Sequence, residues 1–401
     1  MPIYTYFAKS REGETLTGTI EAPDLDSARE ILREKRYIVV SLTEKKEAKF
    51  APLLSRFRGV SLEQKAFFAR QLSTMIAAGL PFTNAFEVLR SQAENPRMKE
   101  VLTGMLGDIQ GGATLSKSMR KYPDVFSRVF IALTEAGEAS GKVEQVLAEL
   151  AEKLEREQEF RGKTKGAFIY PAIIVAAMGI VFIIMIVFVI PRLSSMYADI
   201  GAKLPLPTLI LIKFSNLLIH GWWFLLLLLG LGIFGLRQFI GGDYGRYKIA
   251  EFTFKFPIFG KLSKASQLAD FCRTLSLLIG TGVPIAQALE ITAEAMTNVL
   301  YRNTILNAEK QVEKGIPLSS PLKADPNFPP ILSQMVAVGE ETGKLDEVLA
   351  KLASFFEREA EQSVKNISTA IEPIIMILLG VLVGLFVISI ITPIYNITSQ
   401  L

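Results

Sequence analysis

The sequence predicts a mostly α-helical membrane protein with two homologous helical-bundle domains, three transmembrane helices and a small N-terminal ββαβ module. Three observations lead to this prediction. Half of the 401 residues are apolar although 21% are charged, and the apolar residues are concentrated in long runs without charge. A pattern of helical period recurs in the two halves of the chain. The first residues instead alternate as β-strands do.

The ββαβ module is expected at residues 1–43. The stretches IYTYFA and TLTGTI alternate around SREGE as the strands of a β-hairpin do, and YIVVSL follows as a further strand. Between them, Asp24 stands where a helix N-cap is expected, ahead of an apolar side formed by Ala28, Ile31 and Leu32.

The segment 44–60 is a basic linker in which Phe and Leu are interspersed among Lys and Arg. This composition fits contact with an anionic membrane surface, and it also fits a solvated tether. We favour the tether, with membrane contact as the alternative.

The rest of the chain contains an internal duplication. FARQLSTMIAAGLPFTNAFEVL at 68–89 matches FCRTLSLLIGTGVPIAQALEIT at 271–292, and LTEAGEASGKVEQVLAEL at 133–150 matches MVAVGEETGKLDEVLAKL at 335–352. In both copies, the second motif leads into one apolar stripe at helical spacing. The recurring positions are Arg70 and Arg273, Gly79 and Gly282, Pro81 and Pro284, Glu138 and Glu340, and Gly141 and Gly343.

Three transmembrane helices are predicted at 168–190, 217–236 and 371–394. Each contains a long run without charge, and about 20 such residues cross the hydrocarbon core of a bilayer as a helix. The first and third spans are equivalent in the repeat, because IYPAII, with Pro171, parallels IEPIIM, with Pro373. The middle span has no counterpart, and it returns the chain to the side on which the second helical domain begins.

The charges that flank the spans predict the orientation. Basic residues precede the first span and follow the second, whereas the C-terminal tail has none. The positive-inside rule therefore places the N-terminus and both helical domains in the cytoplasm and the C-terminus outside. The remaining predicted segments are a first helical domain at 61–167, an extracytoplasmic loop at 191–216, a second helical domain at 237–370 and an extracytoplasmic tail at 395–401.

The repeated Gly-Lys motif invites comparison with a phosphate-binding loop, but it fails the requirements. Only three residues separate Gly137 from Gly141, and Val143 stands where a Ser or Thr would bind magnesium. The preceding segment also has the pattern of a helix rather than a strand. We therefore expect no nucleotide site. Gly137 and Gly339 should end a helix, and Gly141 and Gly343 should form the turn that follows.

Composition excludes further classes of site. One cysteine and one histidine leave no intrachain disulfide, no thiol-rich or histidine-based metal site and no Ser-His-Asp triad. A net charge of +4 does not indicate nucleic-acid binding. The sequence contains no paired-carboxylate, HExxH or nucleophile-elbow arrangement. We therefore expect no catalytic residue, no metal, no cofactor and no enzymatic activity.

Several residues have a structural interpretation beside a functional one. Gly380 and Gly384 form a GxxxG pattern inside the third span, which favours close contact between helices. Glu372 stands at the start of that span, where anchoring or a hydrogen bond is a simpler role than a proton relay. Glu138 and Glu340 are expected to cap helices, and contact with a basic partner is the alternative.

Taken together, these motifs resemble the PilC/GspF family, the inner-membrane platform proteins of type IV pilus and type II secretion machines. The resemblance covers essentially the whole chain. It rests on GLPFTNAFEVL, GEASGKVEQVL and YPAII in the first half, and on GVPIAQALEI, GEETGKLDEVL, IEP and PIYNI in the second. It implies two cytoplasmic six-helix bundles and a non-enzymatic scaffold in the bacterial inner membrane. Most of the recurring residues would then specify the fold.

The resemblance also implies partners. These are a separate hexameric ATPase in the cytoplasm, pilin or pseudopilin subunits in the lipid bilayer, other inner-membrane components and further copies of the chain. We expect mechanical coupling of the ATPase to pilin insertion or removal in pilus assembly, with the platform of a protein secretion system as the alternative. A membrane transporter is a distant alternative, because repeats often surround transport sites, but three spans are few and ionisable groups at depth are lacking.

Overall fold

The computed structural model describes residues 3–9, 15–22, 27, 29, 31–32, 38–44, 59–192, 195, 209, 212–213, 215, 217, 221–256 and 259–398. The chain divides into two compact units, which are described separately. One comprises 1–60 with 93–100, and the other comprises 61–92 with 101–401. Most of the predicted linker, most of the predicted extracytoplasmic loop and the last three residues lie outside the described residues.

The described part of the N-terminal unit contains a three-stranded antiparallel sheet. Its central strand β1 (Ile3–Lys9) lies between β2 (Thr15–Glu21) and β3 (Ile38–Glu44). The pairing of β1 with β2 is regular, whereas its register to β3 shifts between Phe7 and Ala8. The few described residues between β2 and β3 include helical ones. The complete ββαβ module stays a prediction.

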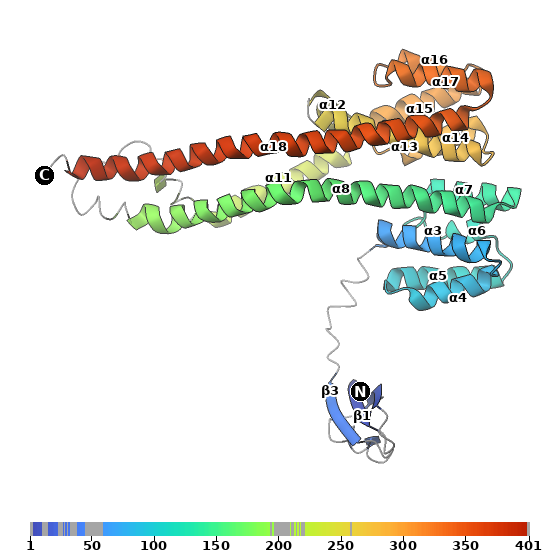
Figure 1. Ribbon diagram of the computed structural model, residues 1–401, viewed down its shortest axis with the longest axis horizontal. Helices are drawn as coiled ribbons and strands as arrows, with labels where there is room; N and C mark the ends of the chain where they lie inside the picture. Colours follow the sequence, from blue (N-terminus) through green and yellow to red (C-terminus); the bar gives the residue numbers. More distant parts are fainter. Residues whose placement is uncertain are drawn as a thin grey trace. The chain divides into compact units, whose positions relative to one another are not determined.

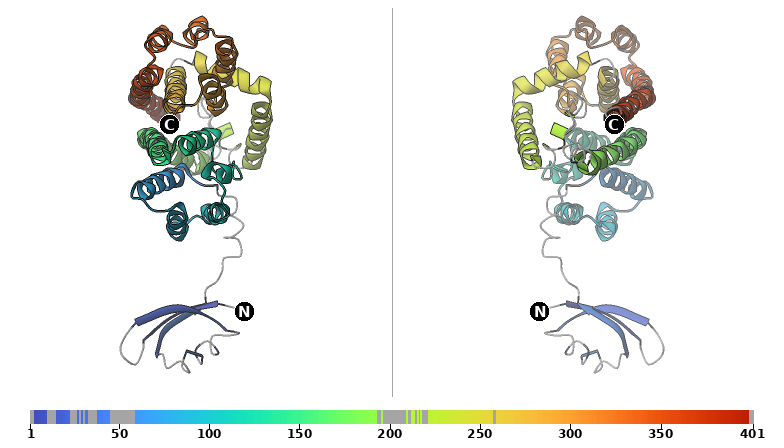
Figure 2. Two further views of the ribbon diagram at one scale, coloured as in Figure 1. Left: turned by 90° about the vertical axis from the view of Figure 1, so that its right-hand side faces the viewer. Right: turned by 90° about the vertical axis from the view of Figure 1, so that its left-hand side faces the viewer.

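The second unit contains most of both copies of the repeat. The helices of the first copy are α3 (Leu62–Ala77), α4 (Phe82–Gln92), α5 (Pro96–Gln110), α6 (Leu115–Met119), α7 (Arg128–Ser140) and α8 (Val143–Ile184). Those of the second copy are α13 (Phe259–Gly280), α14 (Ile285–Ala295), α15 (Val299–Val312), α16 (Ser319–Ala324), α17 (Pro330–Thr342) and α18 (Leu345–Thr398). Equivalent helices follow in the same order (Figure 1). Viewed end-on, the two bundles lie side by side (Figure 2).

Aromatic side chains fill the core of each bundle at equivalent positions. In the first copy, the ring centroid of Phe68 lies 6.0 Å from that of Phe86 and 5.6 Å from that of Phe126. In the second copy, Phe271 and Phe328 replace Phe68 and Phe126 with the same separation of 5.6 Å. All five side chains are buried, which contributes roughly 1.5–3 kcal/mol each. The duplication therefore extends from the surface motifs into the packing of the core.

The turn between the last two helices of each copy corrects one prediction. Gly137 and Gly339 do not end their helices, because α7 and α17 continue beyond them. The helices end where Gly141 and Gly343 adopt left-handed backbone conformations, with φ of 71° and 69°. A Cβ on Gly339 would come within 3.0 Å of the Cα of Leu345. The absence of a side chain there serves close packing between successive helices.

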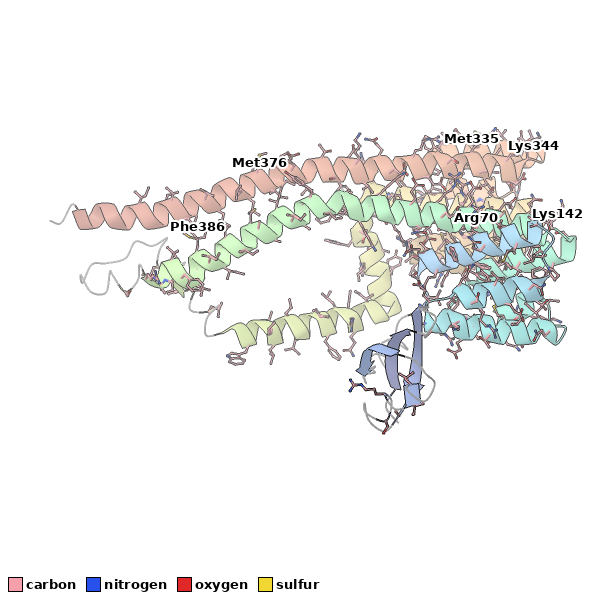
Figure 3. The ribbon with its side chains drawn as sticks, turned by 60° about the horizontal axis from the view of Figure 1, so that its bottom comes forward. Arg70, Lys142, Met335, Lys344, Met376 and Phe386 are labelled. Carbon is pink, nitrogen blue, oxygen red and sulfur yellow. The ribbon has the colours of Figure 1, made fainter. Side chains whose placement is uncertain are left out.

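The last helix of each copy continues far beyond its bundle. α8 has 42 residues and α18 has 54, and neither breaks at the predicted border between helical domain and span. Each includes an apolar stretch long enough to cross a membrane. A short π-helix, η1 (Met185–Val189), extends α8. The turns before the two helices, marked by Lys142 and Lys344, lie at the same end of the unit (Figure 3).

A further apolar helix, α11 (Trp222–Gly241), lies between the two copies. Its clearly apolar part, Leu226–Gly241, is shorter than the two long stretches, so the middle predicted span at 217–236 stays a prediction. Apolar side chains on all three helices face outward: Ile180, Leu228 and Ile377 are 60%, 57% and 69% exposed. A surface of this kind is stable against lipid tails rather than water, which indicates a membrane protein.

Replacing Gly343 by Ala should destabilise the second bundle by about 1 kcal/mol, because a Cβ is unfavourable at positive φ. Gly162→Ala, within α8, is the matched control. No heavy atom lies within 4 Å of the added Cβ, and alanine should stabilise that helix by about 0.5–1 kcal/mol. Thermal unfolding of the full chain in detergent compares the two variants. Equal melting temperatures would contradict the role assigned to the left-handed glycine.

Candidate functional site between the two repeats

An arginine–glutamate ion pair occurs at the same place in each copy. Nε of Arg70 donates to Oε1 of Glu155 at 2.8 Å, and Nη2 donates to Oε2 at 2.5 Å. Nε of Arg273 donates to Oε1 of Glu357 at 3.0 Å, and Nη2 donates to Oε2 at 2.9 Å. Each pair joins the first helix of a bundle to its long last helix. The hydrogen bond from Arg70 lowers the pKa of Glu155, as expected for a charge-assisted pair.

Both arginines recur visibly in the sequence, but their glutamate partners were missed. The available signal was the tripeptide Glu-Arg-Glu, which follows the apolar stripe at 155–157 and again at 357–359. The two pairs differ in their exposure to water. The side chain of Arg70 is 40% exposed, and that of Arg273 is 17% exposed. Water screens the first pair more strongly, so the second should contribute more to stability.

The second ion pair lies where the two repeats meet. Arg156, on α8 of the first copy, approaches Glu357 of the second copy, with 3.6 Å between Nη1 and Oε2. Nearby, Nζ of Lys153 donates to Oγ1 of Thr274 at 2.7 Å. Side chains of α8 therefore bind both α13 and α18. Glu357, which pairs with Arg273 inside the second bundle, also lies within ion-pair distance of Arg156 from the first copy.

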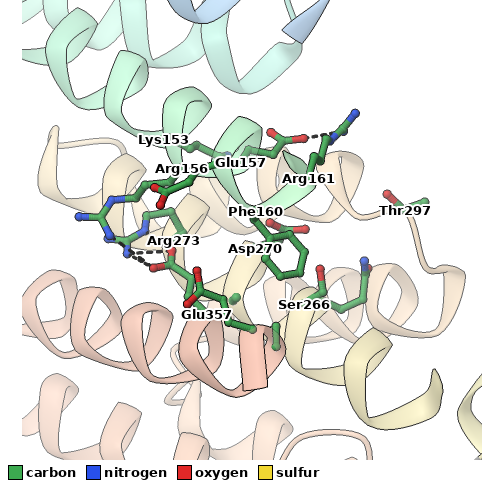
Figure 4. Close-up of a pocket in the computed structure, with 15 residues that line it drawn as sticks. Lys153, Arg156, Glu157, Phe160, Arg161, Ser266, Asp270, Arg273, Thr297 and Glu357 are labelled. Carbon is green, nitrogen blue, oxygen red and sulfur yellow. Dashed lines mark hydrogen bonds and ion pairs between the residues drawn. The ribbon is translucent and has the colours of Figure 1, made fainter. Parts of the chain in front are cut away.

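A cavity of about 330 Å³ opens at this junction, lined by α8, α13 and α18 (Figure 4). The side chain of Asp270 is exposed and lines this cavity, and it makes no hydrogen bond or ion pair with the residues that the structure describes. The surrounding protein raises the pKa of Asp270 to about 6 by removing water, although the charge of Lys153 acts in the opposite direction. Burial likewise lowers the pKa of Lys153. The cavity thus holds an acid and a base from different repeats.

Further ion pairs cross the junction on either side of the cavity. On one side, Nζ of Lys163 lies 2.8 Å from Oε1 of Glu361, and its hydrogen bond to this carboxylate is the main cause that raises the pKa of Lys163 to about 12. On the other side, Arg128 on α7 pairs with Glu294 on α14, and its Nη2 lies 3.7 Å from Oε1 of Glu290. Ion pairs therefore connect the two repeats at several places along the junction.

One hydrogen bond joins the repeats where α8 enters its apolar stretch. Pro171 lacks an N–H, so it cannot donate to the carbonyl of Ala167 four residues earlier. The donor comes from the other repeat, because Oγ of Ser368 on α18 donates to the Ala167 carbonyl at 3.0 Å. Pro373 is the equivalent proline in α18, but Gly166 stands at the position equivalent to Ser368. The first repeat therefore offers no side chain at this position to donate to the carbonyl four residues before Pro373.

The two acidic motif residues cap helices inside their own bundles. Glu138 accepts hydrogen bonds from the backbone N–H groups of Leu115 and Ser116 at the start of α6. Glu340 occupies the same place at the start of α16 and accepts from the N–H of Leu318. A carboxylate at a helix N-terminus satisfies free N–H groups and opposes the positive end of the helix dipole. This is the capping contact expected from the sequence.

Other recurring residues lie in turns. Gly79 and Gly282 have φ of 82° and 88° after α3 and α13, a conformation that favours glycine. Pro81 and Pro284 directly precede α4 and α14. These four residues do not line the cavity, so their described surroundings support a role in the fold.

The predicted residues of the third span lie on the apolar half of α18. Glu372 is exposed, and no described heavy atom comes within 4 Å of a Cβ placed on Gly380 or Gly384. Helix contact at this GxxxG pattern stays a prediction. Further along, α18 meets the end of α8, where the rings of Phe386 and Phe182 lie 5.8 Å apart (Figure 3).

The described residues contain no cluster of three or more His, Cys, Asp or Glu side chains that could hold a metal ion. Cys272 is buried in α13, and burial raises the pKa of its thiol, which disfavours the reactive thiolate. The chemistry available at the junction is therefore electrostatic: charged groups of two repeats hold each other in position around a cavity.

Arg273→Ala should lower the free energy of unfolding by about 2–3 kcal/mol, because it leaves Glu357 without its bidentate partner in a partly buried place. Arg70→Ala, at the equivalent but more exposed pair, is the matched control and should cost about 1 kcal/mol or less. Thermal or denaturant unfolding of both full-length variants tests the difference. A larger loss for Arg70→Ala would contradict this account.

Asp270→Asn should stabilise the protein at pH 7.5 but not near pH 4. The pKa of Asp270 is about 6 in the folded chain against an ordinary value of 3.8. The folded state therefore binds a proton more tightly, and its stability falls as pH rises from about 4 through 6. Asparagine does not ionise, so the Asp270→Asn variant should not lose this stability as the pH rises. The control is Glu359→Gln, which removes a carboxylate of α18 that does not line the cavity. Identical pH profiles of melting temperature for wild type and Asp270→Asn would overturn the prediction.

Comparison with known proteins agrees with the duplication. A family model described as type II secretion system protein F matches residues 68–191 and again 271–393, and the model of its N-terminal domain matches residues 1–43. The chain is 38% identical to the type IV pilus assembly protein PilC of Thermus thermophilus, over 100% of this chain and 99% of the relative. It is 31% identical to the type II secretion system protein F of Xanthomonas campestris, over the whole of both chains.

A third relative, the type IV pilus assembly protein PilC of Pseudomonas aeruginosa, is 32% identical over 86% of this chain and 95% of its own length. The family model matches both copies of the repeat, and these relatives are similar over most or all of the chain. The chain therefore belongs to the type II secretion system protein F family, also called the PilC/GspF family.

Proposed function

We propose that the chain is a non-enzymatic platform in the bacterial inner membrane that serves a type IV pilus assembly machine. One observation carries this proposal: each bundle continues without a break into an apolar stretch, through α8 and α18. A helix that continues without a break transmits a displacement of one end to the other. Force applied to a bundle in the cytoplasm would therefore reach the membrane.

The proposed topology has three spans. α8 and α18 cross in the same direction, and α11 returns the chain between them. The basic residues around the spans favour a cytoplasmic N-terminus, cytoplasmic bundles and an extracytoplasmic C-terminus. The domain borders proposed from the sequence at 167 and 370 then mark where two continuous helices enter the membrane.

The proposed mechanism is mechanical coupling. A separate hexameric ATPase binds the cytoplasmic bundles, and its motion rotates or shifts them. The polar junction between the repeats lets them move as a connected pair, and the membrane helices help pilin subunits to enter or leave the growing fibre. The chain itself has no phosphate-binding loop in its sequence, so the motor is a different protein. Further copies of the chain complete the platform.

An equivalent platform of a type II protein secretion system is the second candidate. Relatives named type II secretion system protein F share 31% identity with the chain in Xanthomonas campestris and 29% in Pseudomonas aeruginosa. The pilus assignment is favoured because the PilC of Thermus thermophilus is 38% identical over essentially the full length of both chains.

Deletion of the coding sequence from the source organism should abolish surface pili and leave protein secretion intact, and the wild-type sequence supplied in trans should restore the pili. Electron microscopy of pili and analysis of secreted proteins in the same cultures provide the measurement. Loss of secretion with pili intact would instead assign the chain to a secretion machine. Survival of both, in a strain without a second copy, would contradict the platform role.

Binding of the ATPase is tested separately. The full chain in detergent should retain the purified hexameric ATPase on an affinity column, and the variant Arg273→Ala, if folded, provides a comparison with a weakened second bundle. Absence of binding to the wild-type chain would contradict mechanical coupling, whichever machine the deletion identifies.

A further inference from the structure

The segment between α11 and the second bundle is a helix with an unusual outer surface. α12 (Asp243–Lys255) begins directly after α11 ends and turns away from its direction (Figure 3). Its inner side packs on the second bundle, where the ring centroid of Phe254 lies 5.7 Å from that of Tyr301. If α11 crosses the membrane, α12 therefore lies at the membrane surface and is held there by the second bundle.

The outer side of this corner carries three exposed aromatic rings, Phe252, Phe256 and Phe259, called here the aromatic patch. Their side chains are 65%, 47% and 47% exposed. The rings contact one another in a row, with centroids 5.6 Å apart for the first two and 6.4 Å apart for the last two. Exposed aromatic clusters of this kind are costly in water and are typical of surfaces that enter another phase or bind a partner.

Two exposed lysines flank the aromatic patch in the sequence. Lys248 lies on the outer side of α12, one turn before Phe252, and Lys261 is exposed two residues after Phe259. Residues 237–264 contain six Lys or Arg against two Asp or Glu. Glu251 offsets part of this charge, with 3.3 Å between its Oε2 and Nζ of Lys248. The remaining excess favours an anionic partner.

We propose that α12 and the start of α13 form an interfacial anchor, in which the aromatic patch enters the headgroup layer and the lysines bind anionic phospholipids. The bilayer is the proposed occupant because Phe252 of the aromatic patch lines the same pocket as Phe239 of apolar α11, and because the patch combines aromatic with basic side chains, as helices that lie on membranes do. The anchor holds the second bundle against the membrane surface. The proposal rests on the membrane topology proposed above, and it is independent of the ATPase and of pilin.

Depth-dependent fluorescence quenching in nanodiscs tests the anchor on the full chain. Cys272 is the single cysteine and is buried, so a thiol-reactive fluorophore selects an introduced cysteine. The test site is Phe252→Cys, which leaves two rings of the aromatic patch in place. Val338→Cys, 47% exposed on α17, is the water-facing control, and Leu228→Cys on α11 is the membrane control.

At Phe252→Cys, we expect lipid quenchers placed near the headgroup to reduce emission strongly and aqueous iodide to reduce it weakly. Val338→Cys should show the opposite, and Leu228→Cys should respond to quenchers deep in the bilayer. If Leu228→Cys responds to lipid quenchers but Phe252→Cys behaves as Val338→Cys does, the topology stands and the anchor is wrong. If aqueous iodide also quenches the label at Leu228→Cys, α11 does not cross the membrane, and both the proposed topology and the anchor that rests on it are wrong.

A label at Phe252→Cys that neither quencher reaches would mean that protein covers the aromatic patch, which also overturns the anchor. The charge dependence provides a second test. Adding Lys248→Gln or Lys261→Gln, or replacing phosphatidylglycerol with phosphatidylcholine, should reduce the ratio of docked to undocked label. About fivefold is expected for each lysine. No change in this ratio would exclude recognition of anionic headgroups.

Discussion

Backbone N–H and carbonyl groups that lie in lipid have to find their hydrogen bonds within the protein, and most of the second unit follows from this constraint. A chain that enters the membrane from a helical bundle meets the constraint at least cost by not breaking its helix. α8 and α18 do this, and the same helix presents an apolar stripe to its bundle and apolar side chains to the outside. The bundle and the span are one mechanical element, and the remaining helices of each copy are arranged around it.

The two copies share a framework but differ where they meet. Arg70 and Arg273 bind equivalent glutamates, yet only the second pair receives an additional arginine from the other copy, Arg156, among the described contacts. The two bundles are thus similar in their internal packing, and they differ in the surface residues through which each contacts the other. Such a junction, made of ion pairs around a cavity, costs little to rearrange compared with an apolar interface, because its charged groups can be solvated when they separate.

Much of this architecture could be predicted from sequence, because helical periodicity and the recurrence of motifs report on local structure. The helices, their order and the turn glycines Gly141 and Gly343 follow from such patterns. The prediction that Gly137 ends a helix was wrong, because glycine is common both at helix ends and at close contacts between helices. The cavity could not be found, since Asp270 and Lys153 come from different copies and each resembles an ordinary charge on a solvated helix face. The middle span was predicted at 217–236, whereas the helix found there, α11, extends from Trp222 to Gly241, because a hydropathy pattern locates a span better than it locates the ends of its helix.

The hydrogen bond from Ser368 to the Ala167 carbonyl limits how the two long helices can move against each other. A slide of α18 along α8 by one helical turn, about 5.4 Å, would remove the hydroxyl from a carbonyl that Pro171 has already deprived of its usual donor. The unsatisfied carbonyl would cost about 1–3 kcal/mol at the edge of the apolar stretch. The ion pair between Lys163 and Glu361 on one side of this bond and the contact of Phe182 with Phe386 on the other would also have to separate in such a slide. Displacements of the bundles that leave these contacts in place therefore cost less than a slide of one long helix along the other, and they carry both spans together.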